Sequence, residues 1–278
     1  MSKPTAHDII AYMESLRNEE QRRQLMRFFK TGKGDYGEGD EFLGLKVPQT
    51  REVVKHSKDL TLEEIPELIT NRYHEVRLCG FLLLVSKFDK LATKRLEFDE
   101  TAIYLRGESR GGKTFSLCRD ETVNSDVSAI CERDRIVRLY LQYADYANNW
   151  DLVDLSAPKI IGRWLMLPSF LDNKRKIVDS LAMSENLWHK RISMVCTWTT
   201  LRKGDASWCL RYSAMHLHHS HDLMHKAVGW MLRELGKQIS MDLLRDFLLQ
   251  HIHEMPRTTL RYAIEKMSEE ERRYWMSL

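Results

Sequence analysis

The chain has 278 residues, of which 43% are hydrophobic and 30% are charged, as in an ordinary globular protein. It has no run of about 18 apolar residues and no apolar core near its N-terminus, so the sequence predicts neither a transmembrane helix nor a signal peptide. Five scattered cysteines without a C-x-x-C pair are typical of small core residues in a reducing compartment. The formal net charge of +3 does not by itself indicate a nucleic-acid partner.

Apolar residues recur at three- and four-residue spacing through most of the chain, and strand-like alternation is scarce. A glycine-rich segment, Thr31–Asp40, predicts a loop, and Pro48 fits the first turn of the helix that follows. We therefore expect an all-α fold. The predicted helices cover Ile9–Phe29, His74–Phe88, Arg135–Tyr146, Trp188–Leu201, Leu223–Leu235 and Leu243–Ile252.

The segment Arg106–Val127 is polar and weakly periodic, and we interpret it as a loop insertion between helical units. Within it, Gly107–Thr114 matches the P-loop pattern G-x-x-x-x-G-K-[ST]. A working P-loop needs a buried strand before it and a helix directly after it. The flanking residues predict neither, so a mobile basic loop is favoured over an ATP site.

The segment Asn148–Pro158 sets an aromatic residue and a carboxylate on one face of a short helix. An asparagine caps its start, Trp150 enters the first turn, and Asp154 follows on the same side. The helix dipole explains Asp151 but not Asp154, which lies beyond the first turn. Pro158 predicts that this helix ends shortly before it and that another starts there. The alternative for this pair is a core tryptophan beside a solvated aspartate.

The second half of the chain resembles itself. Leu187–Arg191 aligns with Leu223–Ala227, and Pro256–Arg261 is a fainter third copy. A period in the mid-thirties with two helices per unit predicts an α-solenoid of HEAT-like repeats, a superhelix formed by one domain over residues 1–278. Its concave side would suit an extended ligand such as duplex DNA or an acidic peptide.

Positive charge is concentrated between Asn186 and Lys237, a stretch that contains eight basic residues and only three acidic ones. Such a stretch favours a phosphate backbone as partner, with scattered solvated lysines as the alternative. Several histidines also gather there without spaced cysteine or carboxylate partners, so a polar turn is favoured over a metal site. These histidines are His216, His218, His219, His221 and His225.

Four blocks in this order resemble the AlkD-like DNA alkylation repair glycosylases, which are built of HEAT-like helical repeats. The resemblance extends from about Leu25 to Lys237, apart from the insertion, and more loosely to the end of the chain. The blocks are Phe42–Pro48 with Arg51, Asn149–Asp154, Asn186–Arg191 and Lys226–Glu234.

The resemblance implies roles for individual residues. The family's essential aspartate matches Asp154, its neighbouring tryptophan matches Trp150, a second active-site tryptophan matches Trp230, and a DNA-contacting arginine matches Arg191. It also implies that the lesion stays stacked while the tryptophans approach its deoxyribose. One departure is Phe28, which lies near the place where the family can carry an aromatic hydroxyl.

We therefore expect a DNA glycosylase that acts on cationic N-alkylated purines in duplex DNA, as a monomer without a cofactor and without membrane attachment. Candidate phosphate contacts are Arg191, Lys190, Lys226 and Arg233. We expect the protein in a bacterial cytoplasm with the nucleoid, or in a nucleus. Two alternatives are a non-catalytic DNA-binding or damage-sensing repeat protein and a helical scaffold that binds a protein partner.

Overall fold

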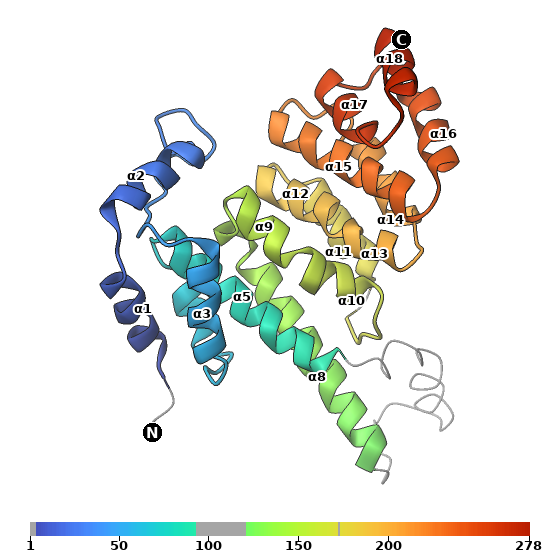
Figure 1. The fold of residues 1–278 in the computed structure, drawn as a ribbon. Helices are drawn as coiled ribbons and strands as arrows, with labels where there is room; N and C mark the ends of the chain where they lie inside the picture. The colour runs from blue at the N-terminus through green and yellow to red at the C-terminus, as the bar shows by residue number, and fades with distance from the viewer. Residues whose placement is uncertain (1–3, 93–120, 172) are drawn as a thin grey trace. The chain divides into compact units, whose positions relative to one another are not determined.

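The computed structural model describes residues 4–92, 121–171 and 173–278 (Figure 1). The regular secondary structure of these residues is helical, and the only β-type pairing among them is an isolated bridge between Glu41 and Tyr73. The all-α fold expected from the sequence is therefore confirmed. Within these ranges no helix has the length and apolar character needed to cross a membrane.

The chain divides into two compact units. The N-terminal unit comprises Met1–Leu152 with Met166–Asp172, and the C-terminal unit comprises Val153–Leu165 with Asn173–Leu278. The single domain over residues 1–278 stays a prediction. Residues 106–120 of the expected insertion, including the P-loop-like segment, lie outside the described residues, whereas 121–127 are helical and form the start of α8 (Glu121–Gln142).

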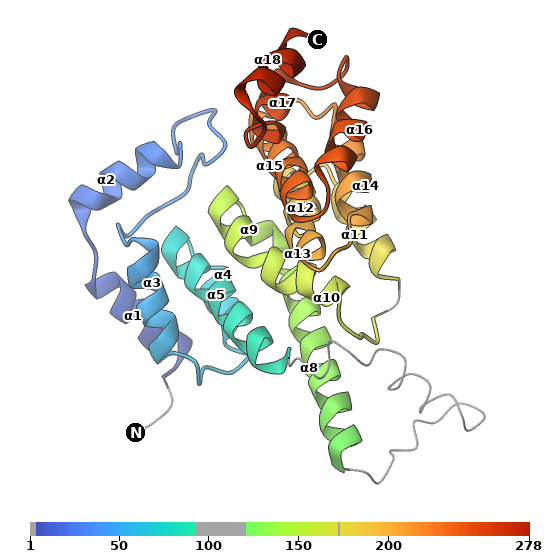
Figure 2. The ribbon, with the colours of Figure 1, turned by 45° about the vertical axis from the view of Figure 1, so that its right-hand side comes forward.

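The N-terminal unit centres on α5, which is buried on nearly all sides because α3, α4 and α8 pack around it. Helices α5 and α8 can be followed in both ribbon views (Figures 1 and 2), and α4 is labelled beside α5 in Figure 2. The elements of this unit are α1 (Ala6–Ser15), α2 (Glu19–Phe28), α3 (Val47–His56), α4 (Ile65–Ile69), α5 (His74–Leu91), α8 (Glu121–Gln142) and η1 (Ala144–Tyr146).

The expected helix over Ile9–Phe29 is in fact two helices. Asn18 leaves the helical conformation, with φ −132° and ψ 105°, and its side chain caps α2 by accepting from the Gln21 amide. Its own amide donates to the Leu43 carbonyl at 2.9 Å. Helical spacing of apolar residues cannot reveal this break, because its cause is a contact with a distant loop.

That loop is held from two sides. The buried Glu75 carboxylate accepts from the amides of Leu43, Gly44 and Leu45 at 2.8–3.0 Å. On the other side Gly44 lies against the start of α2, where a Cβ atom would come within 2.1 Å of the Asn18 carbonyl oxygen. Gly44 also has a φ of +92°, which L-residues with a side chain rarely adopt.

We expect Gly44→Ala to lower the free energy of unfolding by about 3 kcal/mol or more, since left-handed strain and a backbone overlap add. Gly34→Ala is the matched control: its φ is +80°, but among the described residues other than its chain neighbours no atom lies within 4 Å of its Cβ position. The control should lose only about 1–2 kcal/mol. Urea unfolding of both variants measures the difference, and equal losses would contradict a tight contact at Gly44.

In the C-terminal unit, helices α12, α15 and α17 lie side by side (Figures 1 and 2). They begin at Leu187, Asp222 and Arg257, in equal steps along the sequence, as the internal similarity predicts. Along the chain, α13 and α14 lie between α12 and α15, and α16 lies between α15 and α17. The elements of this unit after α9 (Trp150–Ser156) are η2 (Pro158–Gly162), α10 (Arg163–Leu165), α11 (Lys174–Ala182), α12 (Leu187–Val195), α13 (Thr197–Arg202), α14 (Ser207–Met215), α15 (Asp222–Gln238), α16 (Met241–His251), α17 (Arg257–Ala263) and α18 (Glu269–Ser277).

Helix α9 (Trp150–Ser156) starts in the N-terminal unit and ends in the C-terminal unit. As predicted, it ends before Pro158, where a π-helical turn begins. Proline has no amide hydrogen, and the turn closes instead through the bond from the Gly162 amide to the Ala157 carbonyl at 2.9 Å. The Pro158 carbonyl accepts from the Thr199 hydroxyl at 2.5 Å.

Candidate functional site

The start of α9 positions Trp150. The Asn149 side chain, fully buried, accepts from the Trp150 amide at 2.8 Å, so an asparagine directly precedes the helix and binds its first amide. The Trp150 ring is partly exposed and stacks on Phe29, with centroids 5.4 Å apart and an interplanar angle of 22°. Its other aromatic neighbour, Phe28, meets it edge-on at 5.9 Å and is 62% exposed. The N-terminal unit therefore carries a partly exposed aromatic surface at the start of α9.

Asp154, one helical turn further along α9, is bound to Arg191 of α12. The Arg191 Nε donates to Oδ1 at 2.9 Å and its Nη2 donates to Oδ2 at 2.8 Å. The third guanidinium nitrogen donates to the Leu223 carbonyl at 2.7 Å. Only 6% of the Arg191 side chain and 16% of the Asp154 side chain are exposed. This two-pronged bond fixes both the position and the orientation of the carboxylate.

The structure thus places Arg191 against Asp154, whereas the sequence resemblance implied a contact with DNA. A contact between this guanidinium and a phosphate stays a prediction. In the DNA-free chain the Arg191 nitrogens donate to the Asp154 carboxylate and to the Leu223 carbonyl, and the Arg191 side chain is buried.

Trp230 lies in α15, directly after Gly229. A Cβ atom on Gly229 would come within 2.5 Å of the Thr259 carbonyl oxygen, so this glycine lets α15 and α17 approach closely. Consecutive side chains are about 100° apart around a helix, which turns Trp230 away from that contact. Its side chain is partly exposed. Its approach to a nucleotide, like that of Trp150, stays a prediction.

The other candidate phosphate contacts have carboxylate neighbours. Lys226 pairs with Asp222 at 2.8 Å, four residues earlier on α15, and this contact holds the pKa of Asp222 below its usual value. Arg233 pairs with Glu265 and approaches Glu234 at 3.7 Å. Lys190 is partly buried on α12. To bind Lys226 or Arg233, a phosphate would have to replace the carboxylate that pairs with that side chain.

The histidines between α14 and α15 form the expected polar turn. Buried His216 contacts the Ser193 hydroxyl at 2.9 Å, and burial lowers its pKa to about 4. His221 caps α15 by accepting from the Leu223 amide at 3.1 Å. Among residues 4–92, 121–171 and 173–278, no three His, Cys, Asp or Glu side chains gather in an arrangement that could hold a metal ion.

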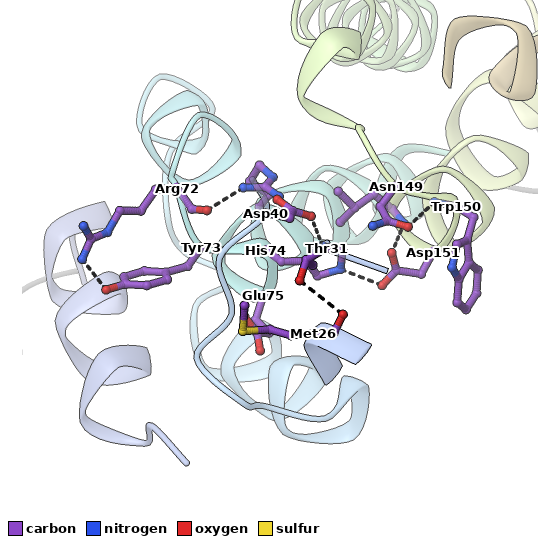
Figure 3. A network of polar contacts seen from close by, with 12 residues as sticks. Met26, Thr31, Asp40, Arg72, Tyr73, His74, Glu75, Asn149, Trp150 and Asp151 are labelled. Carbon is purple, nitrogen blue, oxygen red and sulfur yellow. Dashed lines mark hydrogen bonds and ion pairs between the residues drawn. The ribbon is translucent and has the colours of Figure 1, made fainter. Parts of the chain in front are cut away.

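Sequence reasoning missed a buried charged network behind Trp150 (Figure 3). His74 opens α5 and lies between two carboxylates: its Nδ1 is 3.0 Å from Asp40 and its Nε2 is 2.9 Å from Asp151. Arg77 also pairs with Asp40. The signal available in the sequence was the charged start of an otherwise apolar helix. It predicted a helix but not the partners of its charged residues.

A family model described as DNA alkylation repair enzyme matches residues 9–106 and 119–267 of the chain. Among solved structures, the chain is similar to one described as a predicted DNA alkylation repair enzyme from Enterococcus faecalis, with a TM-score of 0.57 and 12% sequence identity. That likeness covers 91% of this chain and 97% of the other, and at this identity it shows a shared fold. No curated protein sequence matches the chain. Since the family model accounts for most of the chain, the protein belongs to the DNA alkylation repair enzyme family.

Proposed function

We propose that this protein is a DNA glycosylase that releases cationic N-alkylated purines, such as N7-methylguanine and N3-methyladenine, from duplex DNA. The observation that carries the proposal is the Asp154 carboxylate, held by two bonds from Arg191 and placed one turn after Trp150 on α9. The chain belongs to a DNA alkylation repair enzyme family, and this membership supports a role for the carboxylate in removing alkylated bases.

The chemistry of the lesion explains why one carboxylate can suffice. An alkylated purine already carries positive charge, so the C1′–N bond breaks with its electron pair moving to the base, which leaves as a neutral molecule. Water then adds to C1′ of the cationic sugar and loses a proton, which gives an abasic site. Glycosidases that act on neutral leaving groups need a second carboxyl group as general acid. An alkylpurine glycosylase does not.

Asp154 would stabilise the positive charge that develops on the sugar and would position the attacking water. Arg191 would act as a positioning residue, because its bonds fix the direction of both carboxylate oxygens. Trp150 and Trp230 would present ring faces to the cationic nucleotide. Each such contact is worth about 0.5–2 kcal/mol, depending on how far water is excluded.

Phosphate contacts would come from Lys190, Lys226 and Arg233, which set the register of the duplex without reading its sequence. Lys226 and Arg233 have acidic neighbours in the DNA-free chain. We therefore expect duplex binding to weaken as salt rises, since each contact releases counterions.

The experiment that tests the proposal is base release from a duplex oligonucleotide with one N7-methylguanine, measured as free base by chromatography. The matched control is the same duplex with unmodified guanine. We expect release from the alkylated duplex alone. Salt-dependent binding without release from either N7-methylguanine or N3-methyladenine duplexes would support a non-catalytic DNA-binding protein instead. Negligible binding at low salt would favour a scaffold for a protein partner.

A further inference from the structure

The charged network behind Trp150 connects three segments that are distant in sequence. Asp40 lies in the loop between α2 and α3, His74 is the first residue of α5, and Asp151 lies in the first turn of α9. The three side chains are 2–5% exposed. Figure 3 shows the His74 ring between the two carboxylates, with Trp150 directly beside Asp151.

The geometry fixes the protonation of His74. Ionised carboxylates only accept hydrogen bonds, so a ring with a carboxylate oxygen at each nitrogen must donate from both. The ring is therefore an imidazolium. With Arg77, which also pairs with Asp40, two buried positive charges balance two buried negative charges. Removing one member leaves an uncompensated buried charge.

The same ring belongs to an aromatic stack that ends at Trp150. Phe42 stacks on His74 with centroids 4.6 Å apart, and Phe29 lies 4.8 Å from His74. Phe29 in turn stacks on Trp150 at 5.4 Å. His74 is thus connected to Trp150 by two routes: through Asp151, the residue after Trp150 in the chain, and through the Phe29 ring.

We infer that His74 is a positioning residue for Trp150, because its imidazolium joins the Asp40 loop to the start of α9 and thereby sets the orientation of the tryptophan ring. The consequence for base release rests on the proposed function; the consequence for the Trp150 ring does not.

The electrostatics support this role. Burial alone would lower the pKa of His74, but the carboxylates of Asp151 and Asp40 raise it to about 9. The charged groups around the ring are Asp40 from the loop, Asp151 from α9 and Arg77 from α5, while the neighbouring Glu75 carboxylate binds loop amides. Because the folded-state pKa of His74 lies above the ordinary histidine value of 6.5, the His74 proton favours folding fully below pH 6.5. This contribution is lost as the pH rises through about 9.

The experiment uses the position of Trp150 in the chain. It is the only tryptophan of the N-terminal unit, and the other six belong to the C-terminal unit. The full-length protein is labelled with 5-fluorotryptophan, and Trp150→Phe identifies the Trp150 signal by ¹⁹F NMR. We expect His74→Asn and the milder Asp151→Asn to shift or broaden the Trp150 signal while the other six remain in place. His56→Asn, at an exposed histidine of α3, is the matched control and should move none.

Two further readouts follow from the same variants. In the wild type the Trp150 signal should titrate with a midpoint near pH 9, and Asp151→Asn should move this midpoint down, since one of two carboxylate partners is lost. If the protein releases alkylated bases, Asp151→Asn should lower the single-turnover rate by about 10- to 100-fold, with the Kd for DNA changed by less than about threefold.

An unchanged Trp150 signal in folded Asp151→Asn would overturn the inference. So would a collapse of all seven signals in both variants, because His74 would then only maintain the fold. Absence of base release by the wild type would contradict the proposed function and leave the ¹⁹F result to decide the role of His74.

Discussion

Asp154→Asn should lower the rate of base release from an N7-methylguanine duplex by about 100-fold or more. The substitution removes the negative charge that stabilises the developing cation, and the loss of one preorganised electrostatic group costs on the order of 3 kcal/mol. The asparagine oxygen can still accept one bond from Arg191, so the change is conservative in shape. Single-turnover kinetics with enzyme in excess would measure the chemical step directly.

Asp246→Asn is the control, because this exposed aspartate of α16 lies in the same unit. It should leave the rate within about twofold of the wild type. Circular dichroism and duplex binding of both variants show whether fold and affinity are kept. A rate for folded Asp154→Asn within about threefold of the wild type would remove Asp154 from the reaction.

Arg191→Met should lower the free energy of unfolding by about 3–5 kcal/mol, the usual effect of removing one partner from a buried ion pair. The reason is that Asp154 loses both of its guanidinium bonds and the Leu223 carbonyl loses its donor. Combined with Asp154→Asn, the substitution should cost less than the sum of the two single changes, by about 2 kcal/mol. A double-mutant cycle from urea unfolding measures this coupling energy. If the two single changes in the free energy of unfolding simply add in the double variant, Arg191 and Asp154 are not directly bonded in solution.

A second substitution of Arg191 distinguishes two roles of this residue, the positioning of Asp154 and a contact with a DNA phosphate. If Arg191 positions Asp154, Arg191→Lys should slow base release while the salt dependence of DNA binding keeps its slope, because lysine retains the charge but not the two-pronged geometry. Lys190→Ala, the neighbouring substitution, should reduce that slope by about one unit if it removes a phosphate contact. A normal rate in Arg191→Lys would show that the fork geometry is not needed.

Local patterns in the sequence predicted the helices well where packing follows the helix period. The asparagine before Trp150, the end of α9 before Pro158 and the equal steps between α12, α15 and α17 are consequences of short-range chemistry. One error, the single helix expected over Ile9–Phe29, lies where a distant contact intervenes. The break at Asn18 depends on Leu43, which is close only in the folded chain.

The candidate site divides in the same way. The sequence by itself placed Trp150 and Asp154 on one face of one helix, since four residues correspond to about one turn. It also supplied the family resemblance, which the family model confirms. It could not show that Arg191 is bound to Asp154 or that His74 lies between Asp40 and Asp151.

Those pairings were decided by the tertiary structure alone, for a physical reason. The helical spacing of apolar residues predicts which side chains face the core. The partner of a buried charge depends instead on which segments, far apart in the chain, lie close together in the folded structure. The energy of such a pair depends on burial and geometry together, and neither is contained in the residue types.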